Sequence, residues 1–218
     1  MSEQDGVDLG GGERERGARR RVRAEPLSAG ILLHRATPAG PEVLLAHPGG
    51  PWFARKDAGA WTIPKGEPDP GEVMDQAPGP PVGMPGAAAE GSPDRPANED
   101  PGPPSAAGTG GWLLAVALRE FAEETGHPAP PGPVADLGTI VQVGGKVVHA
   151  WAVQGDLNPA TARSNTFELE WPPHSGRRAS FPEVDRVAWF TMAEARRRIR
   201  PAQAPFVDRL AAALELAP

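Results

Sequence analysis

Hydrophobic residues recur at helical spacing in the stretch from 112 to 125. The members of this stripe follow one another at steps of three or four residues, and they are Leu114, Leu118, Phe121 and Thr125. This spacing predicts one buried face of an α-helix with 3.6 residues per turn. Gly126 follows directly, and glycine commonly ends a helix because it adopts a left-handed conformation without steric cost. We therefore expect a helix over 112–125.

Short apolar runs without helical spacing predict the strands. Residues 29–33 and 43–46 flank a Pro/Gly loop and read as two buried strands. Gly144 and Gly145 separate runs at 134–143 and 146–153, which is typical of a β-hairpin. The other expected elements are strands at 61–63, 166–171 and 184–190, a polar loop at 172–180, and helices at 194–199 and 206–216. Strands combined with a central helix and C-terminal helices predict an α/β fold, with a mixed sheet between helices.

Two segments follow neither period. Residues 1–24 are Gly-rich and then Arg-rich, and we expect a disordered basic tail, the alternative being an arm that binds RNA or an acidic partner. Residues 73–111 are mainly Pro, Gly, Ala and Ser, and we expect a disordered insertion, the alternative being a lid or a partner-binding segment. The insertion interrupts a domain expected over 25–214. Bringing the two ends of this insertion together costs only about 2 kcal/mol more in conformational entropy than closing a short connection. The flanking segments can therefore still meet.

Three glutamates lie on one face of the expected helix. Glu120, Glu123 and Glu124 are spaced i, i+3 and i+4, so their side chains emerge within one turn. Like charges at this spacing weaken a helix by a few tenths of a kcal/mol per pair. Two interpretations remain from these residues alone, a solvated face or a face that binds a cation.

The residues on both sides of the insertion resemble the signature of the Nudix hydrolases. That signature runs Gly, five residues, Glu, seven residues, then Arg-Glu-apolar-any-Glu-Glu-any-Gly-apolar. Gly66 and Glu72 have the first spacing, and residues 119–126 match the second part. The intervening segment, 73–118, has 46 residues instead of seven, and removal of 73–111 restores the register. His127 departs from the pattern, since the family has an apolar residue there.

Further segments resemble the small bacterial NTP pyrophosphohydrolase branch of that family, namely 28–33, 42–48 and 181–190. The resemblance implies an α/β/α sandwich that binds Mg²⁺, with Mn²⁺ as an alternative. It assigns metal binding to Glu120, Glu123, Glu124 and the carbonyl of Gly66. It assigns catalysis to Glu120, Glu124, Arg119 and Glu72, with Arg119 paired to Glu72 and aiming the carboxylates.

Substrate contacts are less sharply defined by the sequence. Three cations are candidates for phosphate binding, namely Arg55, Lys56 and Lys65. Glu168 and Glu170 share one face of the alternating strand at 166–171, and family members often take an extra carboxylate from outside the signature. Glu170 is therefore a candidate at the substrate, and the general base stays open among Glu120, Glu124, Glu168 and Glu170.

The resemblance implies hydrolysis of a pyrophosphate linkage in a nucleoside di- or triphosphate or in a nucleoside diphosphate derivative. Hydrolysis of this kind needs neutralisation of phosphate charge, for which Mg²⁺ and carboxylate ligands are suited. The alternative is a catalytically silent Nudix-fold module that binds or senses a nucleotide. The expected partner is thus a small nucleotide, while the individual substrate and the oligomeric state stay open.

Composition narrows the function classes further. The chain has no Cys, which excludes disulfides, a thiol nucleophile and Cys-ligated metals and is typical of a reducing compartment. No apolar run reaches 18 residues and no signal peptide opens the sequence, so we expect a cytoplasmic protein with no membrane partner. A net charge of −6 argues against a stable nucleic-acid partner.

Overall fold

The computed structural model describes residues 26–69 and 106–215. The predicted tail at 1–24, most of the predicted insertion and Glu72 lie outside the described residues, so these predictions stay open. No helix in the described ranges is both long and apolar enough to cross a bilayer.

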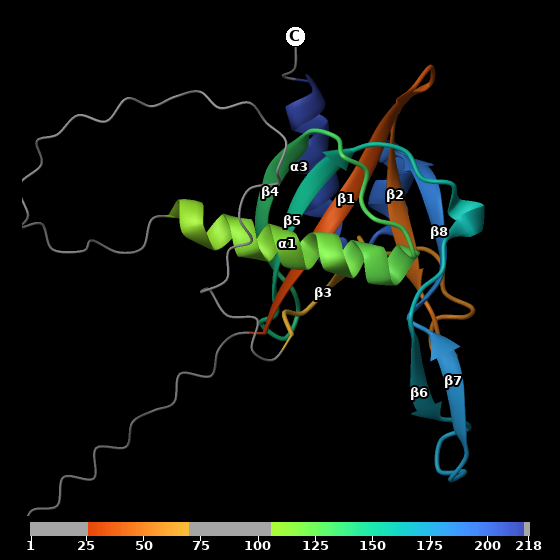
Figure 1. The fold of residues 1–218 in the computed structure, drawn as a ribbon. Coiled ribbons are helices and arrows are strands. Elements are labelled where there is room, and N and C mark those ends of the chain that lie inside the picture. The colour runs from red at the N-terminus through yellow and green to blue at the C-terminus, as the bar shows by residue number, and fades with distance from the viewer. Residues whose placement is uncertain (1–25, 70–105, 216–218) are drawn as a thin grey trace, which may run out of the picture.

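A mixed six-stranded sheet forms the centre of the molecule (Figure 1). Its strands are β1 (Leu27–Thr37), β2 (Gly40–Pro48), β3 (Lys65–Gly66), β4 (Val134–Val141), β5 (Val147–Gln154) and β8 (Val184–Thr191). The order is β4-β5-β1-β2-β8, with β3 beside β1. The β1–β5 pair is parallel and the other pairs are antiparallel. The hairpin predicted around Gly144 and Gly145 is confirmed, and both glycines have a positive φ, 92° and 82°.

Helices cover both faces of this sheet, so the predicted α/β class and three-layer sandwich are confirmed. The helix α1 (Ala106–Thr125) lies across one face, and α2 (Met192–Arg198) and α3 (Ala204–Glu215) lie on the other (Figure 1). Side chains alternate along β1 between the two layers. Ile31 and Leu33 pack in the same cluster as Phe121 of α1, whereas Leu32 packs with Phe206 of α3. A 3-10 turn, η2 (Pro201–Gln203), leads into α3.

Helix α1 differs from the prediction at its start and on its buried face. It begins at Ala106, so residues 106–111 are helical and the prediction that they belong to a disordered insertion was wrong. Its fully buried apolar positions are Leu113, Val116, Ala117 and Phe121, joined by Thr125. Leu118 is 36% exposed instead. The buried face is therefore rotated relative to the predicted stripe. Glu120 and Glu124 lie on this rotated face and are partly buried.

A second, two-stranded sheet projects from the sandwich (Figure 1). It consists of β6 (Thr166–Glu170) and β7 (Arg178–Pro182). The prediction of a loop over 172–180 missed the start of β7, because its polar and basic residues do not differ from those of a turn. The predicted strand at 61–63 forms only isolated bridges, at Trp61 and Thr62.

Phe121 provides a direct test of this arrangement. Truncation by Phe121→Ala removes a fully buried side chain between α1 and the sheet, and it should cost about 3–5 kcal/mol of unfolding free energy. The partly exposed Leu118→Ala, one turn earlier on the same helix, should cost less than half as much. Urea unfolding followed by far-UV circular dichroism measures both, and equal losses would contradict the observed orientation of α1.

Candidate functional site

The end of α1 meets the segment that runs into β3. The backbone N–H of Lys65 donates to Oε2 of Glu124 at 2.9 Å. The next residue, Gly66, lies directly against Glu120, since a Cβ atom added at Gly66 would stand 1.7 Å from Glu120 Oε2. Two glutamates of one helical face thus pack against the backbone of β3. Their fit requires a residue without a side chain at position 66.

The sheet and η2 hold this segment in place. The N–H of Ile31 on β1 donates to the carbonyl of Pro64 at 3.0 Å. The amide oxygen of Gln203, which is fully buried, accepts from the N–H of Ile63 and from the hydroxyl of Thr62, each at 3.0 Å. The sequence analysis missed Gln203, because a glutamine beside a helix start carries no local signal of a partner some 140 residues earlier. The position of β3 against α1 therefore depends on contacts from two other elements.

Burial changes the protonation of the two inward glutamates. It raises the pKa of Glu124 to about 7, an effect that the Lys65 charge and N–H reduce and the carboxylates of Glu120 and Glu183 increase. Burial also raises the pKa of Glu120, and the charge of Arg119 opposes this shift. The pKa of Lys65 is lowered by its own burial. The site thus holds carboxylates whose negative charge is poorly solvated and that a cation would stabilise.

Arg119 joins the carboxylates on the outer side of the helix. Its Nη1 lies 2.9 Å from Oε1 of Glu120 and 2.9 Å from Oε1 of Glu123. Its Nη2 donates to the carbonyl of Glu67 at 3.3 Å, which links the helix to the residue after β3. The pair with Glu123 has the i,i+4 spacing that is also common for an arginine on a helix surface, so the role of Arg119 in aiming carboxylates stays a prediction. The predicted pair with Glu72 involves a residue outside the described ranges and stays a prediction.

Two residues near the site were missed by the sequence analysis. The side-chain amide of Asn165 donates to Oε2 of Glu123 at 3.3 Å, which fixes a glutamate that is 40% exposed. Glu183 is exposed at the junction of β7 and β8, and its charge acts on Glu124. Neither lies close in sequence to the helix. Only the return of the chain past the end of α1 brings them there.

The predicted substrate residues are spread over different places. Lys65 lies at the glutamates. Lys56, in the loop between β2 and β3, lies over the ring of Phe53 with Nζ at 5.1 Å from its centroid, and its neighbour Arg55 is exposed. The structure does not bring Glu170 to the site: its Oε1 accepts from the N–H of Gly176 in the hairpin turn.

The register of the hairpin explains why the outer carboxylates are remote. Glu170 pairs with Arg178 at the far end, whereas Thr166 pairs with Pro182 at the end near α1. Four residues of antiparallel strand separate these two levels by roughly 14 Å. Glu168 lies between them, and its Oε2 is 3.0 Å from Nε of Arg178. Both acids therefore make their contacts within the hairpin.

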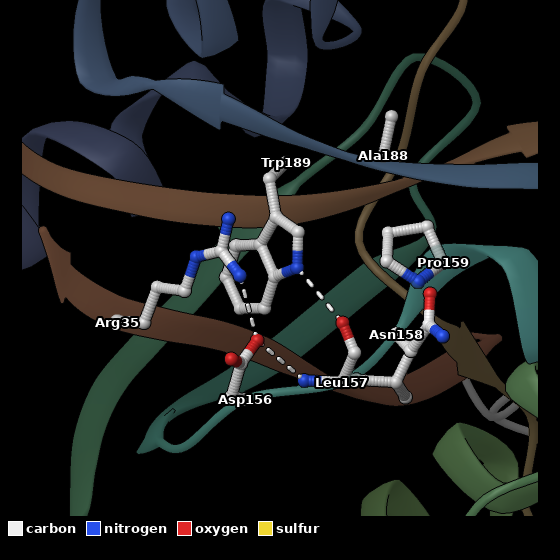
Figure 2. A pocket seen from close by; sticks show the side chains of 7 residues that line it. All are labelled: Arg35, Asp156, Leu157, Asn158, Pro159, Ala188 and Trp189. Atoms are coloured by element: carbon white, nitrogen blue, oxygen red, sulfur yellow. Dashed lines mark hydrogen bonds and ion pairs between the residues drawn. The ribbon is translucent and has the colours of Figure 1, made fainter.

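A cavity of about 510 Å³, lined by residues of β1, of β8 and of the segment 156–159, is a separate feature (Figure 2). Arg35 lies 4.2 Å from the ring centroid of Trp189 and pairs with Asp156 at 2.7 Å and with Glu42 at 2.8 Å. The indole N–H of Trp189 donates to the carbonyl of Leu157 at 2.9 Å. The charged groups of this cavity are thus paired with one another, and its lining includes none of the three helix glutamates.

The donor set around Glu120 and Glu124 fits a hard divalent cation. Carboxylate oxygens are the ligands that Mg²⁺ prefers, and partly buried acids with raised pKa values gain most from a neighbouring positive charge. Within the described ranges, no three acidic or histidine side chains are gathered closely enough to form a metal site by themselves. A cation bound here would therefore need Glu123 or other oxygen atoms as further ligands.

Comparisons with known proteins give similarity at the level of structure. No family model matches the chain, and no curated protein matches it. The NUDIX domain of Shewanella oneidensis NrtR, solved with ADP ribose, is similar with a TM-score of 0.48 and 14% identity over 88% of this chain and 90% of that one. An Ap4A hydrolase from C. elegans has a TM-score of 0.45 and 16% identity, covering 87% and 98%.

The Nudix hydrolase RenU from M. Smegmatis is similar too, with a TM-score of 0.43 and 18% identity over 89% of this chain and 88% of that one. Two of these three solved structures are described as Nudix proteins, and the third as an Ap4A hydrolase. At identities of 14%, 16% and 18%, these similarities concern the fold alone.

Gly66 tests the contact between β3 and α1. In Gly66→Ala the new methyl group would overlap the Glu120 carboxylate, so the helix end or the side chain must move. We expect a loss of about 1–3 kcal/mol of unfolding free energy. The matched control is Gly111→Ala, where no described atom outside the adjoining stretch of helix lies within 4 Å of the added Cβ, and alanine favours the helix. Urea unfolding of the two variants should separate them, and unchanged stability of Gly66→Ala would contradict the close approach.

Glu124 makes stability depend on pH in the metal-free protein. Its folded pKa, about 7, lies above the ordinary value of 4.5, so the folded state favours the protonated acid. Stability is therefore retained below pH 4.5 and lost as the pH rises to about 7, by about 3 kcal/mol in total. Glu124→Gln cannot ionise, and it should be more stable than the wild type at pH 8 in EDTA but not at pH 4.5.

Unfolding curves at both pH values measure this difference. Asp208→Asn serves as a control, since this exposed residue of α3 pairs with Arg196 on the opposite face of the sheet. An equal change in stability caused by Glu124→Gln at pH 4.5 and at pH 8 would show that burial does not raise the pKa of this carboxyl group.

Proposed function

We propose that this protein is a Mg²⁺-dependent hydrolase of the Nudix type. Its substrate would be a nucleoside di- or triphosphate or a nucleoside diphosphate derivative, cleaved at a pyrophosphate linkage. The observation that carries the proposal is the packing of Glu120 and Glu124 against Lys65 and Gly66. Gly66, which opens the first part of the signature, lies there against the helix that carries the second part.

The residues proposed to hold the cation are Glu120, Glu123, Glu124 and the carbonyl of Gly66, with Mn²⁺ as an alternative to Mg²⁺. When bound, such a cation neutralises phosphoryl oxygens and lowers the pKa of an attacking water. A position on a helix that is packed into the core suits this role, because the carboxylates are held in place before substrate binds. Arg119 would orient Glu120 and Glu123 from the outer side.

Substrate charge requires a second group of residues. Lys65 is proposed to bind a phosphate beside the carboxylates, since its backbone is anchored to Glu124 and its side chain is half-buried there. The general base is proposed among Glu120, Glu124 and Glu183. Glu183 joins this group because its exposed carboxylate acts on Glu124, whereas Glu168 pairs with Arg178 on the hairpin.

Turnover of a nucleotide panel tests the proposed function. We expect Mg²⁺-dependent release of phosphate, pyrophosphate or nucleotide from one class among NTPs, dinucleoside polyphosphates, ADP-ribose, NADH and nucleotide sugars, and no release in EDTA. Glu120→Gln and Glu124→Gln should each lower the turnover of that substrate at least 100-fold, because a metal ligand contributes several kcal/mol to the transition state. Asp208→Asn should retain wild-type turnover.

Two results would overturn parts of this proposal. Turnover of Glu124→Gln within about threefold of the wild type would remove the metal assignment. Absence of turnover across the panel, together with measurable nucleotide binding, would identify the alternative, a binding or sensing module.

A further inference from the structure

A cavity of about 440 Å³ lies at the end of the sheet, apart from the helix glutamates. Three segments surround it: the loop between β2 and β3, the turn between β4 and β5, and η2 with the residue before it. Its lining consists of Phe53, Lys56, Ala58, Gly59, Ala60, Gln142, Val143, Arg200, Pro201 and Ala202. We call it the Phe53 cavity. Its volume lies in the range of pockets that hold small organic ligands.

The charge of the Phe53 cavity is positive and uncompensated. Lys56 and Arg200 both lie against the Phe53 ring, at 5.1 and 5.4 Å from its centroid, and its described lining contains no carboxylate. Within residues 26–69 and 106–215, neither cation forms an ion pair with an acid, although many other arginines there do. In a chain with a net charge of −6, two adjacent unpaired cations favour an anionic ligand.

The turn between β4 and β5 supplies two further features. The side-chain nitrogen of Gln142 is buried and has no hydrogen-bond partner among the described residues. Leaving such a donor unpaired lowers the stability of the fold, and an acceptor on a ligand would recover that loss. Val143 at the rim is fully exposed, at 100%. The cavity therefore offers a hydrogen-bond donor and an apolar surface beside its cations, which suits a ligand with an organic body.

The walls of the cavity are fixed before any ligand binds. The buried ring of His47 donates from Nε2 to the carbonyl of Lys56 at 2.7 Å. Asp57 accepts from the indole N–H of Trp61 at 2.7 Å, and the N–H of Arg200 donates to the carbonyl of Trp61 at 2.8 Å. These bonds tie the loop and η2 to the same tryptophan. Binding would then cost little loop ordering.

One short segment of the chain connects the Phe53 cavity to the glutamate site. Ala60 lines the cavity, and Lys65 binds Glu124 through its N–H. Five residues of extended chain span at most about 17 Å. The charges of Arg200 and Glu124 both act on the pKa of Lys65, the first lowering it and the second raising it, so Lys65 lies within electrostatic reach of both places.

We propose that the Phe53 cavity binds a nucleoside 5′-phosphate group. The phosphate lies between Lys56 and Arg200, Gln142 donates to an acceptor on the base or sugar, and the base covers Phe53 and Val143. Assigning this group to the nucleoside half of the substrate rests on the function proposed above. The binding of the group itself rests only on the cavity.

Calorimetric titration of the full-length protein with AMP, GMP, CMP and UMP in EDTA tests the binding without turnover. We expect at least one of them to bind with a dissociation constant of millimolar or below, and more tightly than inorganic phosphate. Arg200→Gln and Lys56→Gln should each weaken this binding about 10-fold or more, because each removes a charge-assisted contact. Lys56 is exposed, so its replacement leaves the core intact. Arg177→Gln, the same charge change in the hairpin turn, should have no effect.

The outcomes separate this inference from the proposed function. No binding of any monophosphate, or binding that neither Arg200→Gln nor Lys56→Gln weakens, would overturn the inference. Binding that depends on both cations without turnover of any panel member would keep the cavity and reject the hydrolase. Turnover whose KM is unchanged in Arg200→Gln and Lys56→Gln would keep the hydrolase and remove the cavity from substrate binding.

Discussion

The hydrogen bond from the Lys65 N–H to Glu124 is the contact on which the site depends. It joins the end of α1 to β3 through two residues that lie 59 positions apart in the sequence. Only one carboxylate oxygen is needed for this bond, and the close approach of Gly66 to Glu120 completes the junction. Everything proposed about chemistry follows from the packing of these two glutamates against a backbone strand.

Burial at this junction has an energetic consequence. The interior that anchors α1 also withdraws solvent from Glu120 and Glu124, which raises the pKa of both. A helix end selected only for stability has little reason to place acids there, since buried like charges lower the stability of the fold. A bound cation would offset that cost, and the arrangement is therefore better explained by function than by packing.

The segment 60–66 connects the two places where a substrate would be held. At one end it lines the Phe53 cavity, and at the other it contacts the helix glutamates. Gln203 fixes its middle by accepting from Ile63 and Thr62, although it belongs to the opposite layer of the sandwich. The layer formed by η2 and α3 thus helps to position a site that lies beside α1.

The sequence by itself determined the strands at 29–33 and 43–46, the end of the helix before Gly126 and the α/β class, because these follow from local periodicity and from glycine conformation. It also indicated Glu120, Glu123, Glu124 and Gly66, through spacing and a family resemblance. Only the tertiary structure decided that Leu118 is partly exposed, that β7 exists, and that Glu170 stays on the hairpin. It alone revealed Asn165, Glu183, Gln203 and the Phe53 cavity. Each of these depends on contacts between residues far apart in the chain, and a local pattern of side chains does not encode such contacts.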